Sequence, residues 1–434
     1  MRFLIGNILK KYKNNKEAKN ASWLIGARVI RMVISLFVGV LTARYLGPSN
    51  YGLINYAAAY VAFFSSLCTL GIDSVIVKNF VDYPNEQGET IGTALMLRFI
   101  SSVLSCCTIF AVSSIVDKGE PTTIKVVVLC SISLIVYIFE TCTFWFQYRY
   151  ESKITAITTF IAYVVTSIYR IILLVLNKDV TWFAFATSVD YIVVAVLLYI
   201  FYKKAGGPKF AFSFEKAKQL LGVSYHFILS GIMVAIYGYT DKFMLKHMLD
   251  STEVGYYSTA TAICGMWVFV LRAIIDSMYP TIMRLYKIDM VAFERKNKQL
   301  YCIVFYVSMT VSIALSLFAP LIIRILYGEE YMGAVSPLRI VTWYTAFSYL
   351  GQARDAWIVC ENTQKYLKYM YMMAVVVNII INSMLIPIWG ASGAALASLI
   401  TQVFTSLIIP CVFKEMRKNV KLMIQAITFQ GVLR

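Results

Sequence analysis

Charged side chains stand inside long apolar stretches of this sequence, where a charge is costly and usually faces a partner or a hydrated cavity. An arginine there can pair with a carboxylate or hold a phosphate group through its planar fork. A lone carboxylate can hold a proton or a cation. The basic positions are Arg28, Arg31, Arg98, Arg170, Lys242, Arg272 and Arg354, and the acidic ones are Asp73, Glu140, Asp190, Asp241, Asp276 and Asp355.

The elements that position these charges follow from composition. The chain has 434 residues, of which 59% are hydrophobic and 15% charged, whereas a soluble domain carries roughly 25% charged residues. Runs of about 20 apolar residues predict membrane-spanning helices. We therefore expect an all-α integral membrane protein with about twelve spans: 22–43, 54–76, 91–116, 124–146, 155–176, 181–202, 221–245, 255–279, 300–325, 337–359, 367–388 and 391–413.

The net charge of +17 is explained by the loops and does not indicate nucleic acid. Most of the 40 Lys and Arg residues fall on one side of the predicted spans, which identifies that side as cytoplasmic. Both termini are then cytoplasmic, as an even number of spans requires. The opposite side has only Arg44, Lys118, Lys125, Lys178, Lys246, Arg324 and Arg339.

The longest polar connection divides the spans into two sets of six. We expect a six-helix lobe at 21–202, a cytoplasmic linker or interfacial helix at 203–220 and a second lobe at 221–413. Basic cytoplasmic tails at 1–20 and 414–434 complete the chain. In the linker, Lys216 and Lys218 stand close to Phe212 and Phe214, which favours an interfacial helix under lipid headgroups. A solvated linker is the alternative.

The two lobes are related by a weak internal repeat. A shift of 203 residues lays LGPSNYGLINYAAA (46–59) over LDSTEVGYYSTATA (249–262), so that Gly52 matches Gly255 and, further on, Asp73 matches Asp276. An even number of spans per half makes this a parallel repeat. Such repeats place substrate near the membrane midplane, between the halves.

The stretch ARYLGPSNYG (43–52), followed by apolar residues to GID (71–73), resembles the polysaccharide transporters of the multidrug/oligosaccharidyl-lipid/polysaccharide (MOP) flippase superfamily. LYGEEYMGA (326–334) and WGASGAALAS (389–398) strengthen the resemblance, which covers essentially the whole chain. It implies a fold like that of the multidrug exporters of this superfamily (MATE), with two six-helix lobes around a cavity that opens alternately to each side.

The resemblance also implies a function. Such proteins carry an undecaprenyl-pyrophosphate-linked oligosaccharide across the cytoplasmic membrane for O-antigen or capsule synthesis, driven by the membrane potential or an ion gradient, here H⁺ or Na⁺. The implied partners are the lipid-linked oligosaccharide, membrane lipids, and polymerase or assembly proteins. A lipid II flippase and a cation-coupled multidrug exporter are the alternatives. An exporter predicts mainly acidic residues in the cavity, whereas the first lobe here leans basic.

Given this resemblance, we predict that Arg28, Arg31 and Arg98 form a cationic pocket for the pyrophosphate. The other candidate cavity residues are Asp73, Arg170, Asp190, Lys242 and Arg272. The alternative is structural pairing, for example of Arg31 or Arg98 with Asp73. Arg272 and Asp276, four residues apart on a helix, favour an intrahelical pair. Asp190 is a candidate for binding the coupling ion.

Enzymatic chemistry has little support in the sequence. It contains no phosphate-binding G-x-x-x-x-G-K-[ST] loop and no nucleophile–base arrangement. The nine cysteines lie in the predicted spans or at their edges without metal-ligand spacing, and His226 and His247 are isolated. We therefore predict no catalytic residues, no metal site and no cofactor other than the coupling ion.

Overall fold

A computed structural model describes the backbone of residues 16–430 and the side chains of residues 34–430, except those of His226, Leu229 and Ser230. Every regular element in that part of the chain is a helix. Seven helical segments there are long and apolar enough to cross a membrane, or eight with the bent pair Ser251–Gly265 and Phe269–Ile288. The expected all-helical membrane protein is confirmed, while the number twelve stays a prediction.

The chain divides into two compact units. The first unit comprises the chain up to Tyr45 together with Ala57–Ile232, and the second comprises Leu46–Tyr56 and the chain from Met233 onward. The helix α9 (Phe214–Met248) runs from one into the other.

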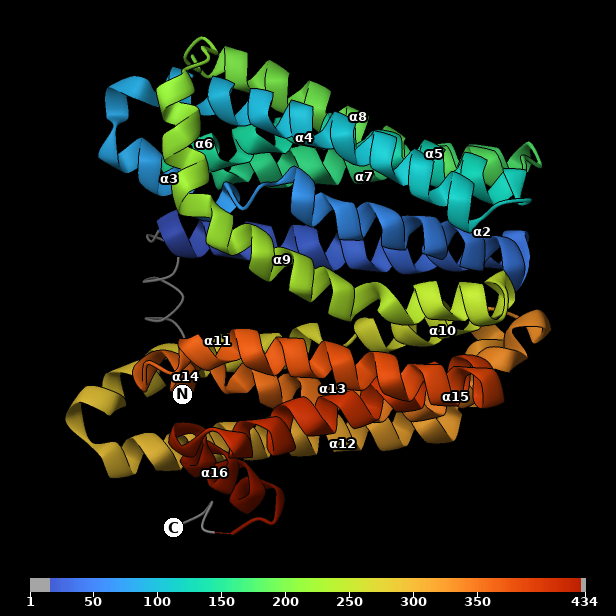
Figure 1. The fold of residues 1–434 in the computed structure, drawn as a ribbon, viewed down its shortest axis with the longest axis vertical. Helices are drawn as coiled ribbons and strands as arrows, with labels where there is room; N and C mark the ends of the chain where they lie inside the picture. The colour runs from blue at the N-terminus through green and yellow to red at the C-terminus, as the bar shows by residue number, and fades with distance from the viewer. Residues whose placement is uncertain (1–15, 431–434) are drawn as a thin grey trace, which may run out of the picture. The chain divides into compact units, whose positions relative to one another are not determined.

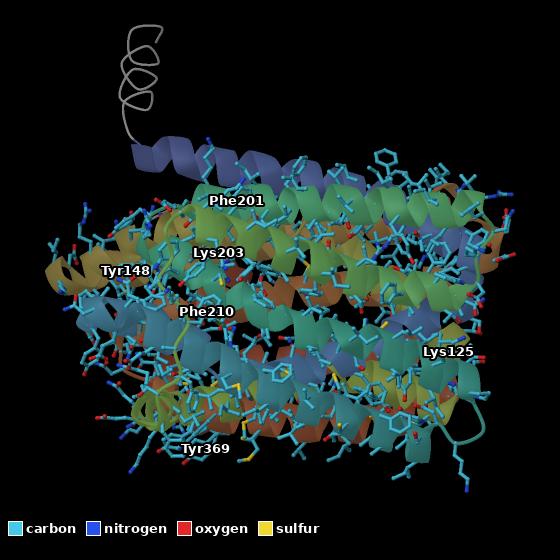
Figure 2. All side chains as sticks on the ribbon, turned by 90° about the horizontal axis from the view of Figure 1, so that it is seen from above. Lys125, Tyr148, Phe201, Lys203, Phe210 and Tyr369 are labelled. Atoms are coloured by element: carbon cyan, nitrogen blue, oxygen red, sulfur yellow. The ribbon has the colours of Figure 1, made fainter. Side chains whose placement is uncertain are left out.

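In the first unit, α4 packs against α5, and both α5 and α7 pack against α8 (Figure 1). Its buried apolar core contains Phe80, Trp145 and Phe146. Figure 2 shows Tyr148, Lys203 and Phe210 toward one end of this unit and Lys125 at the other. Its elements are the greater part of α2 (Lys16–Cys68), α3 (Asp73–Asp82), η1 (Pro84–Glu86), α4 (Gln87–Val116), α5 (Pro121–Val136), η2 (Tyr137–Thr141), α6 (Cys142–Tyr148), α7 (Ser152–Val175) and α8 (Val180–Lys204).

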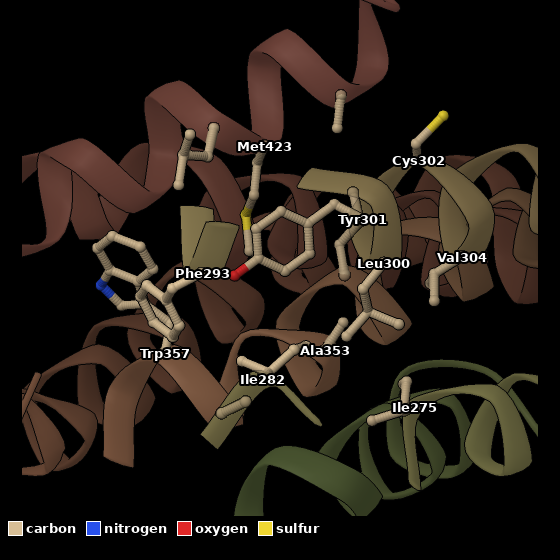
Figure 3. Close-up of a cluster of buried hydrophobic side chains, with 14 of the residues drawn as sticks. Ile275, Ile282, Phe293, Leu300, Tyr301, Cys302, Val304, Ala353, Trp357 and Met423 are labelled. Carbon is tan, nitrogen blue, oxygen red and sulfur yellow. The ribbon is translucent and has the colours of Figure 1, made fainter. Parts of the chain in front are cut away.

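In the second unit, α13 packs against α10, α12 and α15. A buried cluster joins α12, α13 and the carboxyl-terminal α16 (Figure 3), where Phe293 stacks on Trp357 and Met423 is fully buried. After α9, its elements are α10 (Ser251–Gly265), α11 (Phe269–Ile288), α12 (Met290–Leu326), η3 (Glu329–Ala334), α13 (Val335–Ala353), α14 (Asp355–Cys360), η4 (Gln364–Tyr366), α15 (Leu367–Val403), η5 (Phe404–Ile408), η6 (Ile409–Val412), η7 (Lys414–Met416) and α16 (Arg417–Ile427).

The Gly-Pro turn of the motif at 43–52 breaks α2 into two helices. Gly47 has φ 69°, a left-handed conformation that suits glycine, and Pro48 begins the next helix. Gly390 (φ 54°) breaks α15 in the same way. Two of the candidate spans, Ile34–Asp82 and Gln364–Val412, therefore each contain such a reversal.

Residues just past this turn make a reciprocal backbone contact within the second unit. A Cβ atom on Gly52 would meet the carbonyl oxygen of Ser251, and one on Gly255 would meet the carbonyl oxygen of Pro48. The 203-residue shift pairs Gly52 with Gly255 and Pro48 with Ser251. The contact therefore joins residues that the 203-residue shift pairs with each other. The repeat itself stays a prediction.

Candidate functional site

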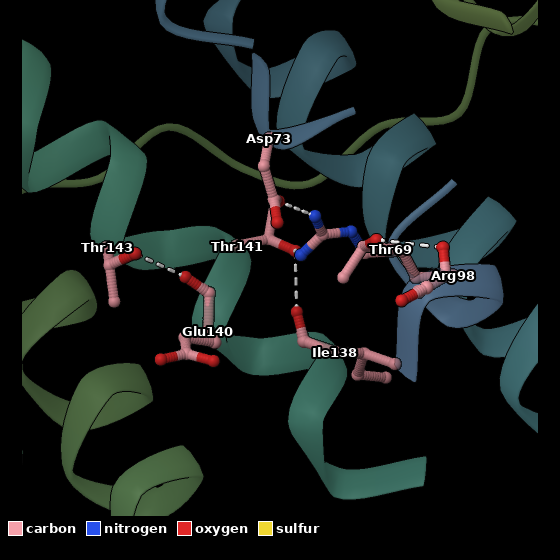
Figure 4. Close-up of polar contacts among 8 residues, drawn as sticks. Thr69, Asp73, Arg98, Ile138, Glu140, Thr141 and Thr143 are labelled. Atoms are coloured by element: carbon pink, nitrogen blue, oxygen red, sulfur yellow. Dashed lines mark hydrogen bonds and ion pairs between the residues drawn. The ribbon is translucent and has the colours of Figure 1, made fainter. Parts of the chain in front are cut away.

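Arg98, on α4, lies in a buried polar network of the first unit (Figure 4). Its side chain is 1% exposed, and its Nη2 forms an ion pair with Asp73 at the start of α3. Its Nη1 donates to the Thr141 hydroxyl at 2.8 Å, and that hydroxyl in turn donates to the carbonyl of Ile138 at 2.6 Å. The break between α5 and α6 at η2 supplies these acceptors. The positive charge is thus neutralised locally.

This geometry corrects the simplest form of the predicted pocket. Arg98 presents no open guanidinium fork, because Asp73 and Thr141 occupy its terminal nitrogens. A phosphate could reach Arg98 only if it replaced Asp73, whose side chain is 35% exposed. The alternative prediction, that Arg98 pairs with Asp73, thus describes the arrangement seen here. The role of Arg98 in substrate binding stays a prediction, and it requires this ion pair to open.

A second network surrounds Asp241, which lies on α9 and is 6% exposed. Its Oδ2 accepts hydrogen bonds from the Tyr257 hydroxyl (2.5 Å) and the Ser398 hydroxyl (2.6 Å). Its Oδ1 accepts one from the Asn382 amide (2.6 Å). The donors come from α10 and from the two halves of α15, so the network joins three parts of the second unit. All three donors are neutral, and the charged residue next to Asp241 on α9 is Lys242.

The surroundings of Asp241 are rich in oxygen. Asn382 also donates to Asn378 Oδ1 at 3.0 Å, and the two hydroxyls lie 3.0 Å apart. The Asn382 Oδ1 atom is buried and accepts no hydrogen bond from the described residues. Carboxylate, amide and hydroxyl oxygens suit a hard cation, and a buried carboxylate can instead take up a proton. The group of residues can therefore change its charge by binding either one.

The remaining predicted site residues are not gathered at one point. Lys242 Nζ lies 3.4 Å from Asn55 Oδ1, within the second unit. Arg272 pairs with Asp276 (Nε–Oδ1, 3.2 Å) as their spacing predicts, and both side chains are more than half exposed.

Within the first unit, Asp190 accepts a hydrogen bond from Thr166 at 3.2 Å. Thr166 lies one helical turn before Arg170, which is half-buried. The side chains of Arg28 and Arg31 lie outside the described residues.

The sequence interpretation missed the polar set around Asp241. A signal was present in VVVNIIINSMLIP (375–387), where Asn378 and Asn382 stand four residues apart in an otherwise apolar run. Two amides on one face of a spanning helix require a polar partner. The partner could not be identified, because Asp241 and Ser398 are distant in sequence and come together only through packing.

The comparisons with known proteins bear on the whole chain. A family model described as "Polysaccharide biosynthesis protein" matches residues 18–286, which is more than half of the sequence. The chain belongs to this family. A membrane protein of Methanocaldococcus jannaschii is 21% identical over 423 residues, covering 88% of this chain and 81% of its own. This is a multi-pass membrane protein of the polysaccharide biosynthesis family.

Solved structures share the fold. The lipid II flippase MurJ in an inward closed conformation superimposes with a TM-score of 0.72 at 15% identity, covering 93% of this chain and 90% of that one. An inward-facing multidrug resistance MATE transporter of the MOP superfamily gives a TM-score of 0.66 at 15% identity, covering 91% and 96%. The predicted MATE/MOP-like fold is therefore confirmed.

Proposed function

We propose that this protein carries a polyprenyl-pyrophosphate-linked oligosaccharide, undecaprenyl-linked in bacteria, across the cytoplasmic membrane by alternating access. Membership of the polysaccharide biosynthesis family is the observation that carries the proposal. The transporter fold supports the mechanism. The product would be used for a cell-surface polysaccharide such as O-antigen or capsule, with a polymerase or assembly protein acting on the delivered unit.

The proposed architecture has twelve spans in two six-helix lobes, 21–202 and 221–413, joined by the linker 203–220, with both tails (1–20 and 414–434) in the cytoplasm. Two of the candidate spans are reversed at Gly47 and Gly390, which supports counting each as two crossings. Helices α9 and α13, of 35 and 19 residues, are further crossings in this proposal. The basic residues concentrated at one set of helix ends support the orientation.

For the substrate, we propose that Arg28 and Arg31 receive the pyrophosphate on the cytoplasmic side and that Arg98 joins them when Asp73 releases it. Asp73 is the more exposed partner of the pair, so an incoming phosphate would meet it first. Asp73 and the phosphate then compete for the same guanidinium. Because Asp73 lies on α3 and Arg98 on α4, this competition would couple substrate entry to a movement of α3 relative to α4.

For the driving force, we propose that the Asp241 network binds the coupling ion, H⁺ or Na⁺, in place of the predicted Asp190. The support is its burial, its neutral donors and its position between α9, α10 and α15. Binding a cation there would add a ligand that holds the oxygens of these helices together and so favour their packing.

The test is transport by the purified protein in proteoliposomes. A fluorescent polyprenyl-pyrophosphate-linked saccharide is placed in the membrane, and its arrival in the other leaflet is measured by chemical quenching of the dye. We expect transport that rises when a Na⁺ or H⁺ gradient is imposed. Parallel assays with lipid II and with a lipophilic cationic dye test the two alternatives. Transport of the dye alone, with neither lipid-linked substrate moved, would favour a multidrug exporter and contradict the proposal.

A further inference from the structure

The segment between α8 and α9, residues 205–213, is not helical and is fixed to the start of α4. We call residues 205–214 the strap. The Ala211 amide donates to the carbonyl of Gly88 at 3.2 Å, and the Ser213 amide donates to the Thr93 hydroxyl at 3.0 Å. Of the predicted linker 203–220, the first two residues complete α8 and the part from Phe214 onward is the start of α9.

Close packing leaves no room between the strap and α4. A Cβ atom on Gly88 would collide with the carbonyl oxygen of Lys209, and one on Gly92 would collide with the backbone of Ala211. Tyr202, near the end of α8, donates to the carbonyl of Pro208 at 2.7 Å. These backbone hydrogen bonds and close contacts fix the path of the strap along α4. Its long side chains are therefore not needed to hold it and can face outward.

Lys216, two residues beyond the strap, holds the start of α9 against the segment that precedes α4. Its side chain is 5% exposed, its Nζ lies 2.5 Å from Glu86 Oε2 and it sits 4.2 Å from the centre of the Tyr83 ring. The expectation that this lysine reaches the lipid headgroups is wrong, because its charge is used inside the protein.

The outward side chains of the strap and its flanks are aromatic or basic. Phe214 is 81% exposed and Phe212 is 54% exposed, and the two rings meet edge to face. Figure 2 shows Phe210 and Lys203 toward the same end of the first unit. Glu215 is the acidic residue between positions 203 and 218. The exposed lysines are Lys203, Lys204, Lys209 and Lys218.

We propose that the strap and these lysines bind the headgroups of anionic phospholipids at this face of the membrane. Exposed phenylalanines are unfavourable in water but stable at the boundary between headgroups and acyl chains. Lysines beside them add attraction to an anionic surface. The strap lies beside the start of α4 and directly after the end of α8, so in the proposed architecture it lies where these two spans leave the hydrocarbon. Because the backbone is fixed, binding requires no folding of a mobile segment.

The experiment uses the full-length protein in neutral detergent, offered equal amounts of phosphatidylglycerol and phosphatidylcholine. Native mass spectrometry counts the lipids of each kind that remain bound. We expect the wild type to retain more phosphatidylglycerol. The triple variant K204Q/K209Q/K218Q should lose this preference, roughly fivefold in affinity for each lysine removed. The variant F212S/F214S should bind less of both lipids while keeping the preference.

The matched control is K118Q/K125Q, which removes two exposed lysines from the opposite end of the first unit. It should leave the lipid ratio unchanged. An unchanged ratio in the triple variant, or an equal loss in the control, would overturn the proposal. So would a change in self-association of F212S/F214S on size exclusion without any change in bound lipid, because the surface would then be a contact between copies of the chain.

Discussion

The two units bury a charge in opposite ways. In the first unit the Arg98 guanidinium is paired with the Asp73 carboxylate, so the charges of these two side chains cancel. In the second unit the Asp241 carboxylate accepts its hydrogen bonds from three neutral donors, and none of these donors is a cation. The first arrangement is stable as it stands. The second gains from a cation or a proton, so it is the better candidate for a site whose occupancy changes during transport.

The comparison also separates structural charges from functional ones. A buried pair made of a cation and an anion is disrupted when either partner is removed, because the other is left uncompensated. A carboxylate with neutral donors tolerates replacement by its own amide, since shape and part of the hydrogen bonding survive. Stability and transport should therefore respond differently at the two sites.

The largest effect is expected at Asp241. Asp241→Asn should reduce ion-driven transport by about 5- to 150-fold, the usual range of a coupling free energy, because the amide carries no negative charge to attract a cation and does not take up a proton. Transport is measured in the proteoliposome assay with and without an ion gradient. Thermal unfolding should change little. Asp276→Asn, which alters an exposed pair, is the control and should retain the response to the gradient.

At the first network, the effect should appear in stability. Asp73→Asn should lower the free energy of unfolding by about 3 kcal/mol or less, since Asp73 is partly exposed and solvent compensates part of the loss. Adding Arg98→Met to this variant should restore much of the loss, because no charge then stays buried alone. Chemical unfolding of the single and double variants gives the coupling. Additive effects would mean that the pair is not a unit.

A competition between Asp73 and the substrate has its own signature. Under the proposed mechanism, Asp73→Asn should also increase the affinity for inorganic pyrophosphate or for the lipid-linked substrate, because Arg98 is freed. Isothermal titration of the variant and the wild type measures this affinity. A purely structural pair would leave the affinity unchanged or lower it.

The glycine contact in the second unit should give a smaller effect. Gly52→Ala and Gly255→Ala should each cost about 1–3 kcal/mol, the usual cost of overpacking, because each added methyl group meets a backbone carbonyl. The two costs should be similar if the contact is reciprocal. Gly39→Ala is the control, since a Cβ atom there has open space. Thermal unfolding of the three variants measures these costs, and very different costs at Gly52 and Gly255 would contradict a reciprocal contact.

The smallest effect concerns an exposed carboxylate. The hydrogen bond that Tyr366 donates to Glu415 (2.7 Å) lowers the pKa of that carboxyl below its usual range. The lowered pKa adds stability above about pH 4, and this stability is lost as the pH falls through the folded-state pKa. Tyr366→Phe keeps the ring that stacks on Phe413 and removes only the donor. Its melting temperature should fall slightly below that of the wild type at neutral pH and converge with it in acid.

Much of the fold could be predicted from local patterns. The apolar runs identified the spanning helices, and Gly47-Pro48 marked the reversal within α2. The i,i+4 spacing of Arg272 and Asp276 identified a pair that forms. The strap was predicted as polar and aromatic, but its extended course was not. That course depends on the absence of side chains at Gly88 and Gly92, which belong to another helix.

The sequence by itself determined that this is a helical membrane protein and which residues carry charge into its interior, because hydrophobicity and helical spacing are local properties. Only the tertiary structure decided which of those charges are neutralised. Arg98 meets Asp73 through the packing of the neighbouring helices α3 and α4, and Asp241 meets Asn382 and Ser398 through the packing of helices that are distant along the chain. The burial and pairing of these charged side chains depend on several helices at once, so the sequence of any one helix does not reveal them.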